Sequence, residues 1–87
     1  MPDSIRRLCR FRFEGPSVDE PVMWRLSRAV PAVVFDLKQA GVRDGVGVIS
    51  VELEGEPEDV DQAIQYIVGD CGGVAEELGE AVVLESA

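Results

Sequence analysis

Hydrophobic and polar residues alternate most clearly in residues 46–55, VGVISVELEG. The apolar residues of one parity are Ile49, Val51 and Leu53. Alternation with a period of two is typical of a strand that buries one face. Gly55 interrupts this pattern, and Pro57 follows at a position where the first turn of a helix tolerates a missing N–H.

Residues 57–68 carry the helical period instead. Their apolar members recur at spacings of three and four, so they share one face of a helix. They are Val60, Ala63, Ile64, Ile67 and Val68. Acidic residues in the first turn favour this helix because its N-terminus is electropositive. We expect the strand and the helix to bury their apolar faces in the same core.

Three further segments also have the strand period. Residues 5–13 place Cys9, Phe11 and Phe13 on one face, and the positions opposite are mostly arginine. Residues 32–40 predict a second strand, whose inward residues are Val33, Phe35 and Leu37. Residues 74–78 predict a last strand, which either ends there or continues to residue 84. The dipeptide Asp44-Gly45 predicts a hairpin turn, and Gly47 predicts a bulge or a close approach of backbone.

A first helix is expected between the first two strands. Ser17 and Glu20 have the spacing of a capping box, so the helix would run from residue 18 or 19 to residue 29. Its buried stripe would consist of Val22, Leu26 and either Ala29 or Val30. Met23 and Trp24 lie beside that stripe. Trp24 either completes the edge of the core or serves as an exposed interface anchor.

The predicted order is β-α-β-β-α-β. It indicates an α+β fold of the ferredoxin-like type, with a four-stranded antiparallel sheet and two helices on one face. Strands one and three would be central neighbours. Residues 1–87 would form one domain with its core in residues 5–78, and the tail at 79–87 would be frayed or bound to a partner.

The uncovered face of that sheet offers two interpretations. Arginines of the first strand would face Glu52 and Glu54 of the third, which explains the basic run as internal ion pairing. Leu8, Val34 and Val48 would leave apolar spots on the same face. The face is then either simply solvated or an oligomer interface, and exposed edge strands are a second route to dimers.

Composition excludes several functions. The formal net charge is −9, and residues 44–87 hold twelve acids and no base, which argues against nucleic acid as a partner. No apolar run is long enough to insert into a membrane and residues 1–13 do not resemble a signal peptide, so a cytoplasmic location is expected. The two cysteines have no metal-ligand spacing and are expected to be thiols. The chain has no histidine, so we expect neither an enzyme nor a cofactor.

Three stretches resemble the NIL domain. Members of this family form the C-terminal domain of the ATPase subunits of bacterial methionine importers, and they also occur alone or fused to ferredoxin modules. The stretches are RFRFEGPSVDEPVMWRLSR, VVFDLKQAGVRDGVGVISVELEG and EPEDVDQAIQYI, and together they reach from about residue 5 to residue 78. The resemblance implies a ferredoxin-like fold and a regulatory domain that dimerises and binds methionine near the subunit interface.

The resemblance also implies where a ligand would bind. The Asn-Ile-Leu run that names the family corresponds to Asp36-Leu37-Lys38 here, so Asp36 replaces the family's asparagine. If an amino acid binds, Asp36 would meet its ammonium, Lys38 its carboxylate, and Val34 with Val48 its apolar side chain. The alternative is an accessory subunit that docks a transporter or ferredoxin-type partner through the interface candidates Leu8, Met23 and Trp24.

Overall fold

The computed structural model describes residues 4–14 and 22–84. Its elements follow in the order β1 (Ile5–Glu14), α1 (Val22–Ala29), β2 (Val34–Arg43), β3 (Val46–Gly55), α2 (Pro57–Gly69), β4 (Val74–Leu78) and β5 (Val82–Val83). The predicted capping box lies outside the described residues. Within the described ranges, neither helix is long and apolar enough to cross a membrane.

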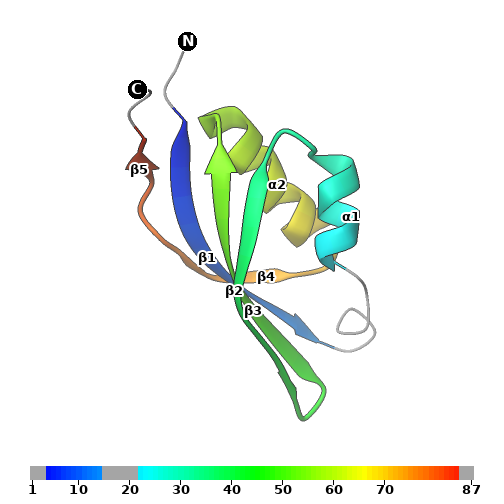
Figure 1. Ribbon diagram of the computed structural model, residues 1–87. Coiled ribbons are helices and arrows are strands. Elements are labelled where there is room, and N and C mark those ends of the chain that lie inside the picture. The colour runs from blue at the N-terminus through cyan, green and yellow to red at the C-terminus, as the bar shows by residue number, and fades with distance from the viewer. Residues whose placement is uncertain (1–3, 15–21, 85–87) are drawn as a thin grey trace.

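All strands belong to one antiparallel sheet. Its order is β2-β3-β1-β4, and β5 also pairs with β1 (Figure 1). The α+β class is therefore confirmed, and β1 and β3 are central neighbours as predicted. The predicted number of four strands is wrong, because the last segment contributes two strands that lie one after the other along β1.

Gly79 lies where the neighbour of β1 changes from β4 to β5. The Gly79 N–H donates to the carbonyl oxygen of Leu8 at 2.8 Å, and the Arg7 Nε donates to the carbonyl oxygen of Gly79 at 2.7 Å. A Cβ atom at this position would stand 2.6 Å from the Leu8 oxygen, so the contact requires glycine. Further along, Val82 and Val83 pair with Arg6 and Ile5.

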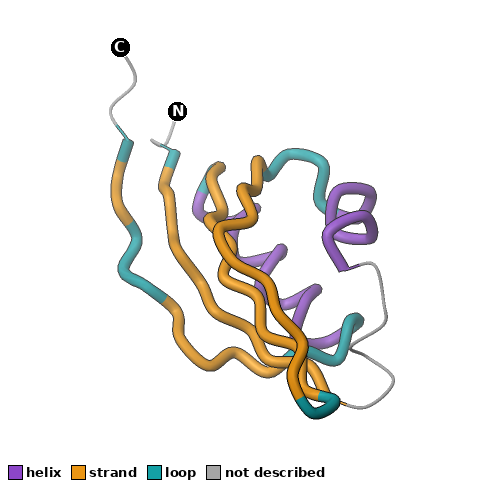
Figure 2. The backbone as a smooth tube through the Cα atoms, turned by 60° about the horizontal axis from the view of Figure 1, so that its bottom comes forward, coloured by secondary structure: helices purple, strands orange, loops and turns teal. Residues whose placement is uncertain are grey.

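Both helices lie on the same side of the sheet (Figure 2). The apolar faces of β1, β3, α1 and α2 meet there in one core. Its buried residues are Ile5, Cys9, Phe11, Phe13, Val22, Leu26, Val30, Val33, Val51, Leu53, Val60, Ala63, Ile67 and Cys71. These include most of the residues predicted to point inward, which confirms that the spacing of apolar residues along the segments indicates their buried faces.

Two predicted core residues are exposed. Leu37 is 45% exposed and Val68 is 41% exposed. Leu37 lies on the edge strand β2, whereas α2 packs over the central strands β1 and β3. Val68 lies in the last turn of α2, at the margin of its buried stripe. Phe35 and Ile64, by contrast, are partly buried against the core.

The β2–β3 hairpin closes as its Asp-Gly sequence predicts. Asp44 and Gly45 have φ values of 54° and 76°, which is the geometry of a type I′ turn. The predicted bulge at Gly47 is wrong, because β3 pairs without interruption through Gly47 with both neighbours.

The irregularity of the hairpin lies in β2 instead. Leu37 pairs with Val51 and Gln39 pairs with Ser50, so Lys38 is the extra residue of a bulge. One extra residue reverses the alternation of every later side chain in the strand. Gln39, Gly41 and Arg43 therefore lie on the face of the sheet that the helices do not cover.

Candidate functional site

The sheet face opposite the helices has two regions of different character. We call the region around Arg6, Asp36, Lys38, Glu52 and Glu54 the paired end. The other region lies towards the tip of the hairpin, over β1, β2, β3 and β4, and contains a depression that we call the outer hollow. The arginines of β1 contribute to both regions.

Each cation of the paired end is bonded to a carboxylate. The Arg6 Nη2 donates to the Glu54 Oε1 at 2.9 Å, and the Arg6 Nε lies 3.3 Å from the Glu52 Oε1. The hydrogen bond that Arg6 donates to Glu54, with the charges of Glu52 and Glu54, raises the pKa of the Arg6 guanidinium. The predicted pairing of β1 arginines with β3 glutamates is thus observed at Arg6.

Asp36 and Lys38, the two predicted charged ligand residues, are bonded to each other. The Lys38 Nζ donates to the Asp36 Oδ2 at 2.8 Å, and this contact raises the pKa of the Lys38 ammonium. The pair is exposed on the edge strand β2. Asp36 lies opposite Glu52 there, and Lys38 is the bulged residue. A ligand that used these two groups would first have to break this ion pair.

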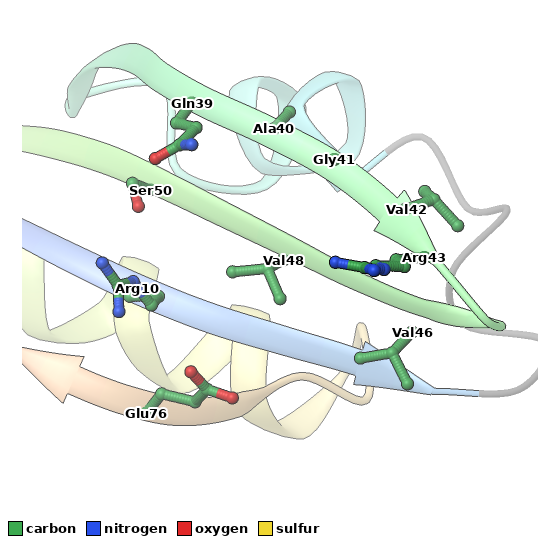
Figure 3. A pocket seen from close by; sticks show the side chains of 10 residues that line it. All are labelled: Arg10, Gln39, Ala40, Gly41, Val42, Arg43, Val46, Val48, Ser50 and Glu76. Atoms are coloured by element: carbon green, nitrogen blue, oxygen red, sulfur yellow. The ribbon is translucent and has the colours of Figure 1, made fainter.

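Three cross-strand rungs build the outer hollow, which has a volume of about 420 Å³ (Figure 3). In β1-β3-β2 order they are Arg10–Ser50–Gln39, Arg12–Val48–Gly41 and Glu14–Val46–Arg43. Arg12 and Glu14 belong to these rungs but do not line the hollow. Side chains of one face in directly opposed positions lie about 4.5–5.5 Å apart at Cβ, so each rung forms a continuous strip. Ala40, Val42 and, from β4, Glu76 complete the lining.

Gly41 leaves open space in the middle of this hollow because it has no side chain. It lies opposite Val48 in the middle rung, and a Cβ atom built on it would meet no atom within 4 Å. The apolar side chain of Val48 is therefore accessible from the β2 side (Figure 3). A glycine inside a strand weakens the strand, and it often marks a place where a ligand approaches the backbone.

Arg10 and Arg43 bring positive charge to opposite ends of the hollow. Neither makes a hydrogen bond or ion pair with any residue in the described ranges. Figure 3 shows the side chain of Arg43 lying along the hollow towards Val48. Two guanidinium groups that are unbonded within the described ranges, beside an apolar surface, can each donate hydrogen bonds to a carboxylate.

Glu76 supplies the negative charge of the hollow. Its Oε1 lies 3.7 Å from the Arg12 Nε, which is too long for a hydrogen bond. That same Nε is buried without a hydrogen-bond partner among the described residues, and its other carboxylate neighbour, Glu14, is 3.6 Å away. Glu76 is thus held loosely by Arg12 and keeps its capacity to accept hydrogen bonds.

The structure brings one of the four predicted ligand residues into the hollow. Val48 lines it, whereas Val34 pairs with Glu54 in the paired end and is 65% exposed. The roles predicted for the other three residues, Val34, Asp36 and Lys38, remain a prediction, and these residues lie at a separate place on the same face. The other nine residues of the lining were not predicted as site residues, and the bulge that turns the β2 residues outward has no sequence signal of its own.

The remaining predicted residues lie elsewhere. Trp24 is 59% exposed on α1, and the guanidinium of Arg28 lies 5.0 Å from the centre of its ring. Met23 is half-buried and packs against the core. Leu8 is exposed on the outer face between Arg6 and Arg10.

Cysteine and metal chemistry have little structural support in the described part of the chain. Cys9 and Cys71 are both buried, and burial raises the pKa of the Cys9 thiol. No group of three or more His, Cys, Asp or Glu residues in the described ranges is arranged to hold a metal ion.

Solved structures with a similar backbone are known, although a search of curated proteins found no match. The de novo designed protein Foldit4 has a TM-score of 0.63 and 12% identity, covering 95% of this chain and 100% of its own. An amidase of the hydantoinase/carbamoylase family from Burkholderia phymatum has a TM-score of 0.57 and 13% identity, covering 98% of this chain and 32% of its own. At such identities these similarities concern the fold alone.

Sequence similarity identifies the family. The model of the NIL domain matches residues 7–70, which reach from the third residue of β1 to the end of α2 and therefore cover most of the chain. The matched range contains nine of the ten residues that line the outer hollow, all except Glu76. The chain belongs to the NIL domain family.

Proposed function

We propose that the chain is a non-enzymatic regulatory module that binds a small molecule of the amino-acid class in the outer hollow. Membership in the NIL domain family supports a regulatory small-molecule-binding module. The location rests on two arginines, Arg10 and Arg43, that make no hydrogen bond or ion pair with any other described residue and lie beside the side chain of Val48, which Gly41 leaves accessible. We also propose that the fold is a ferredoxin-like one with an added strand, β5.

The hollow offers each chemical group of an amino acid a suitable neighbour. The carboxylate is placed on Arg43, whose planar guanidinium can donate two parallel hydrogen bonds. An apolar side chain lies on Val46 and Val48, and the ammonium meets Glu76 at the β4 side. Methionine is the first ligand to test, because its flexible thioether adapts to shallow apolar surfaces.

A non-enzymatic role agrees with the residues present. The chain contains no histidine, and the lining of the hollow contains no cysteine. Binding that changes a partner's activity needs differential contacts rather than a base or a nucleophile.

Calorimetric titration with methionine and the other amino acids tests this proposal. We expect heat from at least one amino acid, unchanged in Asp36→Ala and lost in Arg43→Ala. Loss in Asp36→Ala with retention in Arg43→Ala would move the site to the predicted residues of the paired end. No heat from any amino acid, with the chain folded, would refute the sensor function.

We also propose that the module is a homodimer formed along the edge of β2. Among the described strands, β2 pairs with β3 alone, which leaves a ten-residue edge for pairing with a second copy. Leu37 and Val42 add exposed apolar surface there. Sedimentation velocity should show a dimer that Leu37→Lys converts to a monomer, and a monomeric parent protein would refute this part.

A second candidate function is an accessory subunit that docks a transporter or ferredoxin-type protein through α1. The exposure of Trp24, with Arg28 stacked on it, favours this reading, because aromatic and arginine side chains dominate interface energies. Retrieval of one defined partner from cell extract, lost in Trp24→Ala and kept in Arg43→Ala, would support it. Equal retrieval by both variants would exclude α1 as the docking surface.

A further inference from the structure

The two arginines of the outer hollow stand at its opposite corners. Arg10 belongs to the first rung on β1, and Arg43 belongs to the third rung on β2. Their rungs cross β3 at Ser50 and Val46, four residues apart, which corresponds to about 13 Å along the strand. The two guanidinium groups therefore approach the hollow from different ends.

A single carboxylate leaves one of these arginines without a partner. If Arg43 holds the carboxylate of an amino acid, Arg10 still faces Ser50 and Gln39 at the other end of the hollow, while Glu77, opposite Arg10 on β4, lies outside the lining. These three side chains all carry hydrogen-bond donors, namely a guanidinium, a hydroxyl and an amide. This first rung is thus chemically complementary to a second anionic group.

The charges of the lining lead to the same conclusion. Its ionised members are Arg10, Arg43 and Glu76, with a sum of +1. A zwitterion such as methionine leaves this excess uncompensated. A ligand with two carboxylates and one ammonium carries −1 and neutralises it, with the ammonium at Glu76.

From these observations we propose that the hollow selects an acidic amino acid, a small molecule with two carboxylates and one ammonium. This inference rests on the proposed function, since it names the ligand class of the same site. Arg43 holds one carboxylate, Arg10 holds the second with Ser50 and Gln39, and the methylenes between them lie on Val48. The selectivity opposes the overall charge of −9, so it depends on this local arrangement of arginines.

Glutamate and glutamine provide the decisive pair of probes, because they have the same shape and differ in one carboxylate. Calorimetry should give glutamate at least about tenfold tighter binding than glutamine, the range expected for a hydrogen-bonded charge. Arg10→Ala should reduce that ratio to about one. Arg6→Ala, which removes the same charge from the paired end, should leave the ratio unchanged. Titrations with aspartate and 2-aminoadipate then show which distance between the two carboxylates of the ligand gives the tightest binding.

The outcomes separate this inference from the proposed function. Methionine or glutamine binding as tightly as glutamate would overturn the inference and leave the regulatory module intact. A glutamate preference that survives in Arg10→Ala would also overturn it. No binding by any amino acid would refute both.

Discussion

The two ends of the outer sheet face are built from the same strands and yet differ in their chemistry. At the paired end, Arg6 is bonded to Glu54 and Lys38 to Asp36, so each cation has a nearby carboxylate. At the outer hollow, Arg10 and Arg43 make no hydrogen bond or ion pair within the described ranges, although Glu77 of β4 lies opposite Arg10 in the register. The contrast shows that the cations of the paired end are occupied by carboxylates within bonding distance, whereas those of the outer hollow keep their donors for a ligand.

The cause of this contrast is the sequence of β3. It places Glu52 and Glu54 opposite β1 at one end, but Val46, Val48 and Ser50 at the other. Carboxylates in the first group neutralise arginine, whereas the second group leaves an apolar and hydroxyl surface. A charged residue beside such a surface keeps its hydrogen-bonding capacity for a ligand.

The largest expected effect comes from filling the hollow. Gly41→Leu should abolish ligand binding, because the new side chain would cover Val48. The position is open and its φ is not in the left-handed region, so the chain should remain as stable as the parent protein. Calorimetry and thermal unfolding measure the two effects separately. Gly69→Leu places the same side chain in open space at the end of α2 and should retain binding. Undiminished binding in Gly41→Leu would show that the ligand lies elsewhere.

The next effect separates the two ends directly. Arg43→Ala should weaken binding by about 1.5–3 kcal/mol, the cost of losing hydrogen bonds to a charged group. Arg6→Ala should leave the dissociation constant unchanged, because the Arg6 guanidinium already donates its hydrogen bonds to Glu54. Calorimetric titration of both variants provides the comparison. An equal loss in both would indicate a general electrostatic effect instead of a site.

Gly79 lies at the boundary of the two ends, where β4 gives way to β5. Gly79→Ala should destabilise the fold by about 1–3 kcal/mol, because the new methyl group would clash with the carbonyl oxygen of Leu8. Denaturant unfolding measures this loss, and Gly69→Ala is the control in open space. Amide exchange should accelerate at residues 82–84 first. Unchanged stability would mean that the chain relaxes at the boundary without cost.

The smallest effect concerns the Asp36–Lys38 pair. Its hydrogen bond raises the pKa of Lys38, so the folded state binds that proton more tightly than the unfolded state does. The resulting stabilisation is present below the unfolded pKa of about 10.4 and is lost as the pH rises through the raised folded value. In Lys38→Met, the free energy of unfolding should therefore fall slightly less steeply at alkaline pH than in the parent protein, and this difference should appear only at low salt. An effect that persists in high salt would show that packing, and not charge, is responsible.

Periodicity predicted the fold because most segments are buried on one side. Phe11, Leu53 and Ile67 are buried on the faces that their spacing indicates, and the central position of β1 and β3 followed from the order of elements. The β5 strand was missed as a separate element, because the turn at Gly79 depends on a contact with Leu8.

The outer hollow was not predictable in the same way. Strict alternation from Asp36 would place Ala40 and Val42 outward, but the bulge at Lys38 turns Gln39, Gly41 and Arg43 outward instead. Bulges are set by the geometry of the pairing and not by a residue type. Glu76 reaches the hollow from β4, and its position depends on another register shift, in β4 beside Arg10 and Phe11.

The most direct test of the outer hollow as the ligand site is a titration of the isotope-labelled chain followed by NMR. With glutamate as the ligand, the amide shifts should change at Arg10, at residues 39–43 and at residues 46–50. They should stay unchanged at Arg6, Asp36 and Glu54 of the paired end. Changes confined to the paired end or to the helices would contradict the account.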